Sequence, residues 1–252
     1  MSSQEPSIIG IMLIAIPSKS RPWKSASKEL LKEGILFVPE QELELYWRIY
    51  GSDVVGVPRE IKGITATRNW ILDQYEGEDI VFVDDDLKQA GYVVTKSDGK
   101  KKHVKLTESE LMEEFAKSFE LTKSLGYKIF GLKTESSPMS QYDEKPFLFK
   151  TYVTASCMGI VNDTGLRFDE DFKVKEDYEI SCRHIEKYGG ILGVRYIYWE
   201  NHHWDTNGGC GDYRTDMMES ECINKLIRKY PNFVKSVNRK NSKYCIKLMF
   251  GE

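Results

Sequence analysis

The chain has 252 residues, of which 40% are hydrophobic and 30% charged, with a formal net charge of −3. This length allows one large domain with its own core and does not require two. We expect no membrane-spanning helix, because no apolar stretch reaches the roughly 20 residues that a span requires. The five cysteines are odd in number and never spaced as C-x-x-C, which argues against a disulfide framework and a zinc cluster and favours the reducing cytoplasm.

Strand and helix patterns alternate through the first half of the chain. The apolar run Ile8–Ile16 predicts a strand, not a signal peptide, because it lacks a basic start and a small-residue cleavage site. The pattern then predicts a helix over Trp23–Glu33, a strand over Ile35–Val38, a helix over Glu40–Tyr50, a strand over Val54–Val57, a helix over 65–75 and a strand over Ile80–Val83. This alternation indicates an α/β fold in which helices cover both faces of one sheet.

Three consecutive carboxylates, Asp84, Asp85 and Asp86, follow the strand that ends at Val83. In open α/β sheets ligands bind outside the carboxyl ends of the strands, which is where this cluster lies. An acidic turn or a helix cap would account for one aspartate. Because three adjacent carboxylates repel one another, we favour a bound cation that prefers oxygen ligands, Mg²⁺ or Mn²⁺.

A protein-bound Mg²⁺ usually bridges one or two carboxylates to phosphates of the substrate, so the cluster predicts a phosphorylated substrate. The sequence has neither a G-x-x-x-x-G-K-[ST] loop nor a G-x-G-x-x-G motif after its first strand, which argues against P-loop hydrolysis and dinucleotide binding. The first strand instead leads into "AIPSKSRP", where Pro17, Ser18 and Arg21 are candidates for lining a base or ribose pocket.

The segments "IPSKSRP", "TATRN", "IVFVDDDL" and "KEDYEISCRHIEKYGG", in this order, resemble a GT-A glycosyltransferase. The resemblance covers residues 8 to about 216 and implies a single, mostly parallel mixed sheet and a D-x-D motif that binds a nucleotide-sugar with Mn²⁺ or Mg²⁺. The segment "NHHWDTNGGCGDYR" further resembles the TET-associated glycosyltransferases of phages, which are related to the enzyme that glucosylates hydroxymethyluracil in kinetoplastid DNA.

The resemblance implies roles for the acidic cluster and for two histidines. Asp84 and Asp86 match the outer positions of D-x-D, one toward the ribose and the metal and the other a direct ligand, and Asp85 would face the donor sugar. A histidine from the second half often completes the metal site, and His202 and His203, after a strand over Ile191–Tyr198, are the candidates. Adjacent side chains on an extended segment point to opposite faces, so the two are not equivalent, and packed or surface histidines remain the alternative.

The segment "KVKEDYEISCRHIEKYGG" predicts a helix from about Tyr178 to Gly189, with Glu176 and Asp177 at its N-terminus. One interpretation is that both acids only cap the helix, where the macrodipole favours negative charge. Inverting GT-A enzymes place the base that takes the acceptor proton at this position, so the resemblance implies Asp177 as the base, with Glu176 second.

Two arginines and a glycine-rich loop are further candidates for donor binding. Arg68 and Arg214 would bind the diphosphate by bidentate hydrogen bonds, or else form surface salt bridges. The loop containing Gly208 and Gly209 would close over the donor and exclude water, or else form a passive turn.

Local charge is the feature that bears on the acceptor. We divide the chain into a GT-A domain, residues 1–222, and a basic C-terminal segment, residues 223–252, in which the stretch from 223 to 247 has eight Lys or Arg and no acid. A second basic stretch, "KSDGKKKHVK", has the D-G turn of a hairpin. Both are either solvated faces or contacts to DNA phosphates. Four aromatic residues are candidates for stacking on an extruded base, although core packing is their commoner role: Tyr142, Phe147, Phe149 and Tyr152.

These features together predict an inverting, metal-dependent glycosyltransferase that moves a sugar from a UDP-sugar donor to 5-hydroxymethylpyrimidines in phage DNA. Three alternatives stay open: a protein, lipid or polysaccharide acceptor, a non-catalytic nucleotide-sugar or DNA-binding module, and a metal-dependent nuclease or phosphotransferase. The sequence leaves the donor sugar, the anomeric outcome, the acceptor base and the oligomeric state undetermined.

Overall fold

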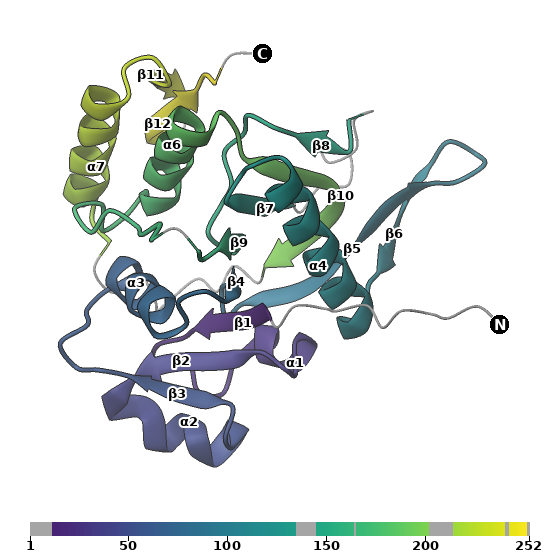
Figure 1. The fold of residues 1–252 in the computed structure, drawn as a ribbon, viewed down its shortest axis with the longest axis vertical. Helices are drawn as coiled ribbons and strands as arrows, with labels where there is room; N and C mark the ends of the chain where they lie inside the picture. Colours follow the sequence, from purple (N-terminus) through teal and green to yellow (C-terminus); the bar gives the residue numbers. More distant parts are fainter. Residues whose placement is uncertain (1–11, 135–144, 164, 202–213, 240–241, 251–252) are drawn as a thin grey trace.

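The computed structural model describes residues 12–134, 145–163, 165–201, 214–239 and 242–250. Its strands are β1 Met12–Pro17, β2 Ile35–Pro39, β3 Val54–Val57, β4 Asp79–Val83, β5 Leu87–Thr95, β6 Lys101–Lys105, β7 Ile129–Thr134, β8 Phe147–Leu148, β9 Cys157–Val161, β10 Leu192–Asn201, β11 Val234–Arg239 and β12 Ser242–Leu248. Its helices are α1 Ala26–Leu30, the 3₁₀ turn η1 Glu40–Glu42, α2 Leu43–Tyr50, α3 Ile64–Gln74, α4 Glu108–Ser124, α6 Glu176–Tyr188 and α7 Asp216–Lys229. Figure 1 shows their arrangement.

Within the described residues, ten strands form one mixed sheet in the order β3-β2-β1-β4-β9-β7-β10-β5-β6, with β8 paired to β10. The pairs β3-β2, β2-β1, β1-β4 and β7-β10 are parallel. Strand β9 runs antiparallel between β4 and β7, and β5 runs antiparallel to β10. Most strands therefore point the same way, and the carboxyl ends of β1 and β4 open on one edge of the sheet.

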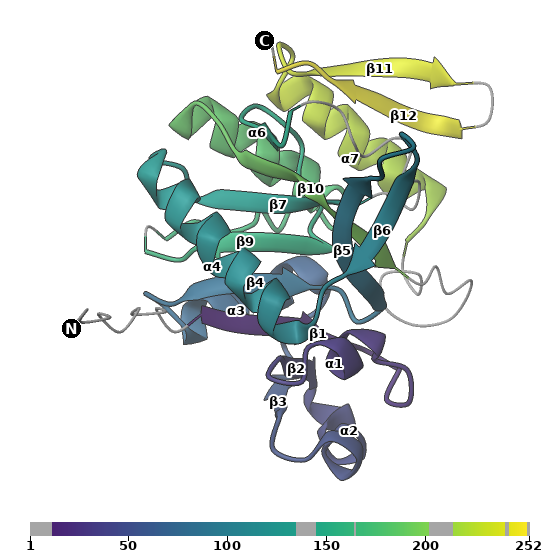
Figure 2. The same ribbon diagram turned by 90° about the vertical axis from the view of Figure 1, so that its right-hand side faces the viewer.

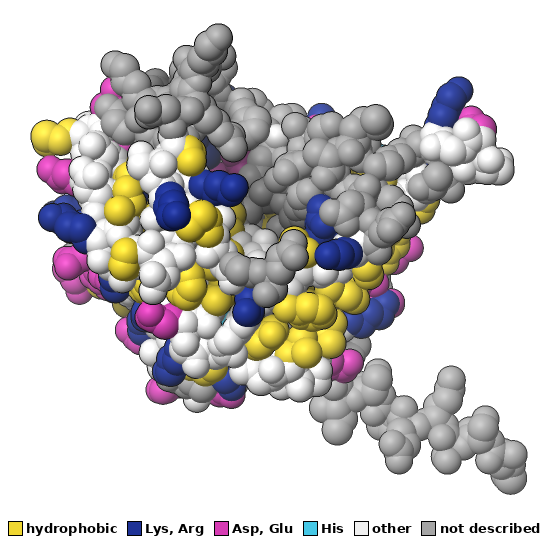
Figure 3. Space-filling model, turned by 90° about the horizontal axis from the view of Figure 1, so that it is seen from above, with side chains coloured by type: hydrophobic (Ala, Val, Ile, Leu, Met, Phe, Trp, Pro, Cys, Tyr) yellow, Lys and Arg dark blue, Asp and Glu magenta, His cyan; other side chains and the backbone are white. Residues whose placement is uncertain are grey.

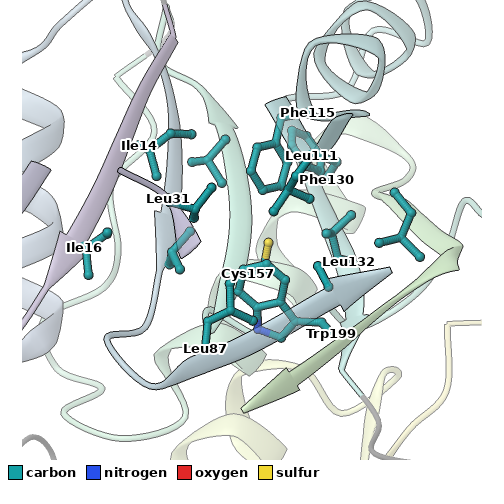
Figure 4. Packing of buried hydrophobic residues seen from close by; sticks show 14 of the residues in the cluster. Ile14, Ile16, Leu31, Leu87, Leu111, Phe115, Phe130, Leu132, Cys157 and Trp199 are labelled. Atoms are coloured by element: carbon teal, nitrogen blue, oxygen red, sulfur yellow. The ribbon is translucent and has the colours of Figure 1, made fainter. Parts of the chain in front are cut away.

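Helices cover both faces of this sheet, as the alternating pattern predicts. On one face Leu111 and Phe115 of α4 pack with Phe130 of β7, and α1 and α2 join the same core (Figure 4). On the other face Ile71 of α3 and Ile180 of α6 pack in a second core. Figure 2 shows the two layers of helices with the sheet between them.

Two helix boundaries differ from the sequence-based expectation. The helix expected over Trp23–Glu33 is the short α1, because Ser25 caps it by accepting a hydrogen bond from the Lys28 N–H, which leaves Trp23 outside with 71% of its surface exposed. The helix expected from Tyr178 begins two residues earlier, so Glu176 and Asp177 form its first turn.

The C-terminal part of the chain packs on α6 through a third core. Strands β11 and β12 form a separate hairpin, and buried residues of this hairpin and of α7 meet Cys182 of α6. Glu179 of α6 is fully buried and accepts hydrogen bonds from Lys229 and Tyr230 at the end of α7. The boundary placed at residues 222 and 223 falls inside α7.

None of the helices in the described part of the chain combines the length and the apolar composition that a membrane span requires. The described cysteines Cys157, Cys182 and Cys222 are buried and free.

Candidate active site

The acidic cluster turns directly off the end of β4 and joins it to β5. The Asp84 N–H donates to the Ser156 carbonyl oxygen at 3.1 Å, which continues the pairing of β4 with β9. The Ser27 hydroxyl donates to the Asp84 carbonyl oxygen and accepts the Leu87 N–H at 2.8 Å, so α1 fixes both ends of the turn. The sequence offers no signal for Ser27, whose role depends on α1 packing beside β5.

Asp85 points to the loop that follows β1. Its carboxylate accepts hydrogen bonds from the Ser18 hydroxyl at 2.6 Å and from Arg21 Nη1 at 2.9 Å. The Tyr46 hydroxyl of α2 lies 2.9 Å from Ser18 Oγ and accepts the Arg21 N–H at 3.0 Å. Ser18, Arg21 and Asp85, three of the predicted binding residues, are therefore in contact, and Pro17, which ends β1, leads into them. Tyr46 is a residue of this group that the sequence analysis missed.

Arg68 of α3 connects the acidic cluster to helix α6. Its side chain is only 3% exposed, and its guanidinium donates to Glu176 Oε1 at 2.7 Å and to Asp84 Oδ1 at 3.2 Å. The guanidinium also lies over the rings of Phe82 and Phe168, with its Cζ atom 6.0 and 5.6 Å from their centres. In this structure Arg68 holds two protein carboxylates together, where the sequence analysis assigned it to the diphosphate.

Asp177 occupies the first turn of α6, next to Glu176. One carboxylate oxygen accepts a hydrogen bond from the Tyr152 hydroxyl, and the other accepts the Tyr178 N–H at 2.9 Å. The residue before the helix, Lys175, has the left-handed φ of 65°, and its ammonium lies 3.2 Å from Glu219 of α7. Contacts of Asp177 with Tyr152 and of Lys175 with Glu219 therefore fix the start of the helix that carries both acids.

The site crowds carboxylates into partly buried positions, which alters their acidity. Burial raises the pKa of Asp84 to about 7 against the opposing effect of Arg68, even though 42% of its side chain is exposed. Burial, followed by the charge of Asp85, raises the pKa of Asp86 to about 6. Burial also raises the pKa of Glu176, whose neighbour Asp177 adds to the shift, and the pKa of Asp177. Protons therefore bind this cluster more readily than they bind exposed carboxylates.

One buried oxygen of the acidic cluster has no hydrogen-bond partner among the described residues. Asp86 Oδ1 is buried, and no described residue hydrogen-bonds to it. Asn201 at the end of β10 is the register partner of Leu87, the residue after Asp86, and its Oδ1 atom is likewise buried without a partner in the described part of the chain. Unsatisfied buried oxygens are rare, and a cation that prefers oxygen ligands would satisfy them.

The described residues do not form a complete metal cage. No three carboxylate, histidine or cysteine side chains among them come close enough to hold an ion alone. His202, His203, Gly208 and Gly209 lie outside the described residues. Arg214, the second arginine assigned to the diphosphate, forms an ion pair with Glu219.

The aromatic residues proposed for base stacking separate in the structure. Phe147 packs edge-on against Tyr196, while Phe149 is 45% exposed. Tyr152 stacks on Tyr178 with ring centres 4.2 Å apart and contacts Asp177. Tyr142 lies outside the described residues.

Solved structures with a similar fold include proteins in complex with UDP or a UDP-sugar. Glucosyl-3-phosphoglycerate synthase from Mycobacterium tuberculosis, in complex with Mn²⁺, UDP and glucosyl-3-phosphoglycerate, has a TM-score of 0.50 and 11% identity, over 99% of this chain and 94% of that one. Residues 1–349 of S. aureus TarS, in complex with UDP-GlcNAc, have a TM-score of 0.49 and 15% identity, over 86% of this chain and 66% of that one. The chain thus spans less than two thirds of the TarS fragment. No protein with a curated description matches the sequence.

A sequence model of one family matches more than half of the chain. The family is described as TET-associated glycosyltransferase, and the match covers residues 12–208, which include the acidic cluster and the start of α6. The predicted resemblance to this family is confirmed by the match, and the predicted GT-A fold by the match together with the structure. The chain belongs to the TET-associated glycosyltransferase family.

Proposed function

We propose that the protein transfers a sugar from a UDP-sugar to a hydroxyl group, with Asp84 and Asp86 as metal ligands and Asp177 as the base. The observation that carries this proposal is the contact of Arg68 with both Asp84 and Glu176. This contact brings the carboxyl end of β4, where the diphosphate and its metal would bind, next to the first turn of α6. The donor and the acceptor would therefore bind side by side in one site.

The residues at β4 fit a Mn²⁺ or Mg²⁺ ion. Asp86 Oδ1, which is buried and has no hydrogen-bond partner in the described part of the chain, supports this assignment. Mg²⁺ needs only one or two carboxylates when substrate phosphates complete its coordination. A bound cation would neutralise the charge that develops on the departing diphosphate. The structural neighbour from M. tuberculosis binds UDP with Mn²⁺, which is consistent with this pairing.

The hydrogen bonds of the two acids favour Asp177 over Glu176 as the base. Glu176 is held in an ion pair with Arg68 through Oε1, so a protein cation already engages one oxygen of its carboxylate. Asp177 accepts instead from the neutral hydroxyl of Tyr152 and from a backbone N–H. Asp177 would take the proton of the acceptor hydroxyl as the new glycosidic bond forms, which fits an inverting reaction.

We further propose hydroxymethylpyrimidine in DNA as the acceptor. The description of the family supports this assignment, and so does the position of basic residues. Lys235 and Lys247 are exposed and lie directly opposite each other on β11 and β12. Figure 3 looks onto this end of the molecule and shows Lys and Arg side chains scattered among hydrophobic and acidic ones. Like charges at opposed positions destabilise a hairpin, and a polyanion would relieve their repulsion.

The experiment that tests the donor and the acceptor uses a panel of UDP-sugars with duplex DNA that carries 5-hydroxymethylcytosine or 5-hydroxymethyluracil, in the presence of Mn²⁺. We expect UDP release together with a mass increase of one sugar residue on the modified base. UDP release with a protein, lipid or polysaccharide acceptor, but not with DNA, would refute the acceptor assignment. DNA binding without turnover would identify a binding module, and strand cleavage would identify a nuclease.

The Asp177→Asn variant tests the assignment of the base. We expect kcat to fall by about 10² or more while the affinity for UDP and Mn²⁺ is retained, because the variant loses only proton transfer. Glu176→Gln serves as the comparison. An equal loss of rate and of UDP affinity in Asp177→Asn would show that Asp177 acts only in capping the helix.

A further inference from the structure

Two glycines of the sheet leave space for the segment 151–153, which leads toward α6. Gly131 of β7 and Gly193 of β10 are direct register partners in the sheet. A Cβ atom on Gly131 would lie 2.5 Å from Val153 Cβ, and one on Gly193 would lie 2.5 Å from Thr151 Cγ2. Both distances are shorter than van der Waals contact allows, so only glycine lets Thr151 and Val153 lie this close to the sheet.

Tyr152, the residue between them, contacts the first turn of α6. Its ring stacks on Tyr178, and its hydroxyl donates to the Asp177 carboxylate. The segment has one more link to the same turn, because the Ser181 hydroxyl accepts the Val153 N–H at 3.4 Å and donates to the Asp177 carbonyl oxygen at 2.7 Å. One of these contacts reaches Asp177 directly, and the other two reach Tyr178 and Ser181 in the same part of α6.

We propose that Tyr152, which lies between Thr151 and Val153 in the chain, is the positioning residue of the base and fixes the orientation of the Asp177 carboxylate by donating a hydrogen bond to one oxygen. The proposal rests on the function proposed above, in which Asp177 takes the acceptor proton. Tyr152 itself is not required to touch the donor or the acceptor.

The geometry explains what such a hydrogen bond contributes. Asp177 Oδ1 already accepts the Tyr178 N–H at 2.9 Å, so the Tyr152 bond to Oδ2 leaves the carboxylate without freedom to rotate. A carboxylate held in one orientation presents its remaining lone pairs to the acceptor in a fixed direction. Orientation is therefore the first effect that Tyr152→Phe should remove.

The same hydrogen bond also favours the ionised form that a base needs. Burial raises the pKa of Asp177, whereas the Tyr152 hydroxyl opposes this rise, as do the charges of Arg68 and Lys175. Glu176 and Asp84 are the carboxylates that face Asp177 and repel its charge. Without the hydroxyl the pKa of Asp177 should rise further, and the base should be protonated over a wider range of pH.

The test compares Tyr152→Phe with Tyr196→Phe. Tyr196 makes a similar buried hydrogen bond, to Glu114 at 2.6 Å, but on the α4 face of the sheet, so its variant controls for the loss of a tyrosine–carboxylate bond as such. We expect Tyr152→Phe to lower kcat by about 10- to 100-fold, the range for a lost hydrogen bond to a charged group. The acid limb of its kcat profile should move to higher pH, while the affinity for UDP and Mn²⁺ stays within about twofold.

A second variant and a second measurement keep the two proposals separable. Gly131→Ala should displace Val153 and therefore reproduce part of the loss in kcat while Tyr152 itself remains. The titration of the Asp177 carboxyl carbon, followed by ¹³C NMR and assigned with Asp177→Asn, needs no acceptor. It should shift to higher pH in Tyr152→Phe and stay in place in Tyr196→Phe.

Two results would overturn the positioning role. The first is a Tyr152→Phe enzyme whose kcat, pH profile and Asp177 titration equal those of Tyr196→Phe. The second is a parallel loss of UDP affinity and kcat with an unmoved Asp177 titration, which would indicate a merely structural role. If the parent protein transfers no sugar to any acceptor, the proposed function fails, and the NMR titration alone decides whether Tyr152 controls Asp177.

Discussion

Arg68 and Glu176 are 108 positions apart in the sequence, yet their side chains meet at 2.7 Å. The pair is largely enclosed, with 3% of the Arg68 side chain and 12% of the Glu176 side chain exposed. The same guanidinium reaches Asp84, so one buried cation joins the turn after β4 to the start of α6. The alignment of the two halves of the site depends on this contact.

We predict that Arg68→Gln destabilises the protein by about 3 kcal/mol, because it leaves the buried Glu176 carboxylate without its cation. Urea unfolding measures this change. Arg48→Gln is the control, since its ion pair with Glu44 is 70% and 79% exposed and its loss should cost at most about 1 kcal/mol. Combining Arg68→Gln with Glu176→Gln should recover part of the stability. Equal effects of the Arg68 and Arg48 changes would show that the buried contact does not stabilise the fold.

Binding of Mn²⁺ with UDP should weaken as the pH falls from about 7.5 to about 5.5, because protons compete with the metal for its carboxylates. The pKa values of Asp84, raised to about 7, and of Asp86, raised to about 6, place the competition in this range. Titration calorimetry at several pH values measures it. Asp86→Asn should abolish turnover and most of the Mn²⁺-dependent UDP affinity, since an amide replaces an anionic ligand. Wild-type UDP affinity in this variant would remove Asp86 from the metal site.

Replacing Lys235 and Lys247 by Ser should weaken DNA binding at low salt. Each lost phosphate contact should reduce the slope of log affinity against log salt by about 0.9, so two contacts account for about 1.8. UDP affinity should not change, and stability should stay equal or rise slightly, because two opposed like charges are removed. Lys32 and Lys62, both exposed and on other parts of the chain, give a control pair with the same change in charge. A salt slope that both double variants share with the parent protein would show that the hairpin is only a solvated surface.

Residue His184 should make stability depend on pH. It is fully buried on α6, and its Nε2 atom accepts the Lys128 N–H at 2.9 Å, which requires the neutral ring. Burial lowers its pKa to about 4 from the ordinary 6.5, so the unfolded chain binds a proton that the folded protein excludes. Stability is therefore complete above about pH 6.5 and falls as the pH drops toward 4, with a slope of up to about 1.4 kcal/mol per pH unit.

Urea unfolding of the parent protein and of His184→Gln between pH 7.5 and pH 4.5 separates this effect from that of the carboxylates. The difference in stability between the two proteins should shrink as the pH falls, because only the parent protein must exclude the extra proton. A difference that stays constant over this range would mean that His184 is not held neutral in the fold.

The sequence by itself determined the local elements and the chemistry at their ends. Alternating apolar runs predicted the α/β layers, since the periods of strand and helix are local properties of the chain. The triple aspartate was placed correctly after the fourth strand, because a buried run and a polar stop are both visible in one short stretch. The sequence also placed Glu176 and Asp177 at the N-terminus of α6, although the helix begins two residues earlier than its apolar spacing indicated.

Only the tertiary structure decided which of these groups touch. Asp85 meets Ser18 from 67 positions away, Tyr152 meets Asp177 from 25 and Arg68 meets Glu176 from 108. The sequence analysis assigned Arg68 to the diphosphate, whereas in the structure its guanidinium contacts the carboxylates of Asp84 and Glu176. Periodicity and composition do not encode such pairs, because the order of strands in the sheet and the packing of α3 and α6 on one face bring them together. A buried charge is stable only when it is paired with an opposite charge, because leaving it unpaired would cost several kcal/mol.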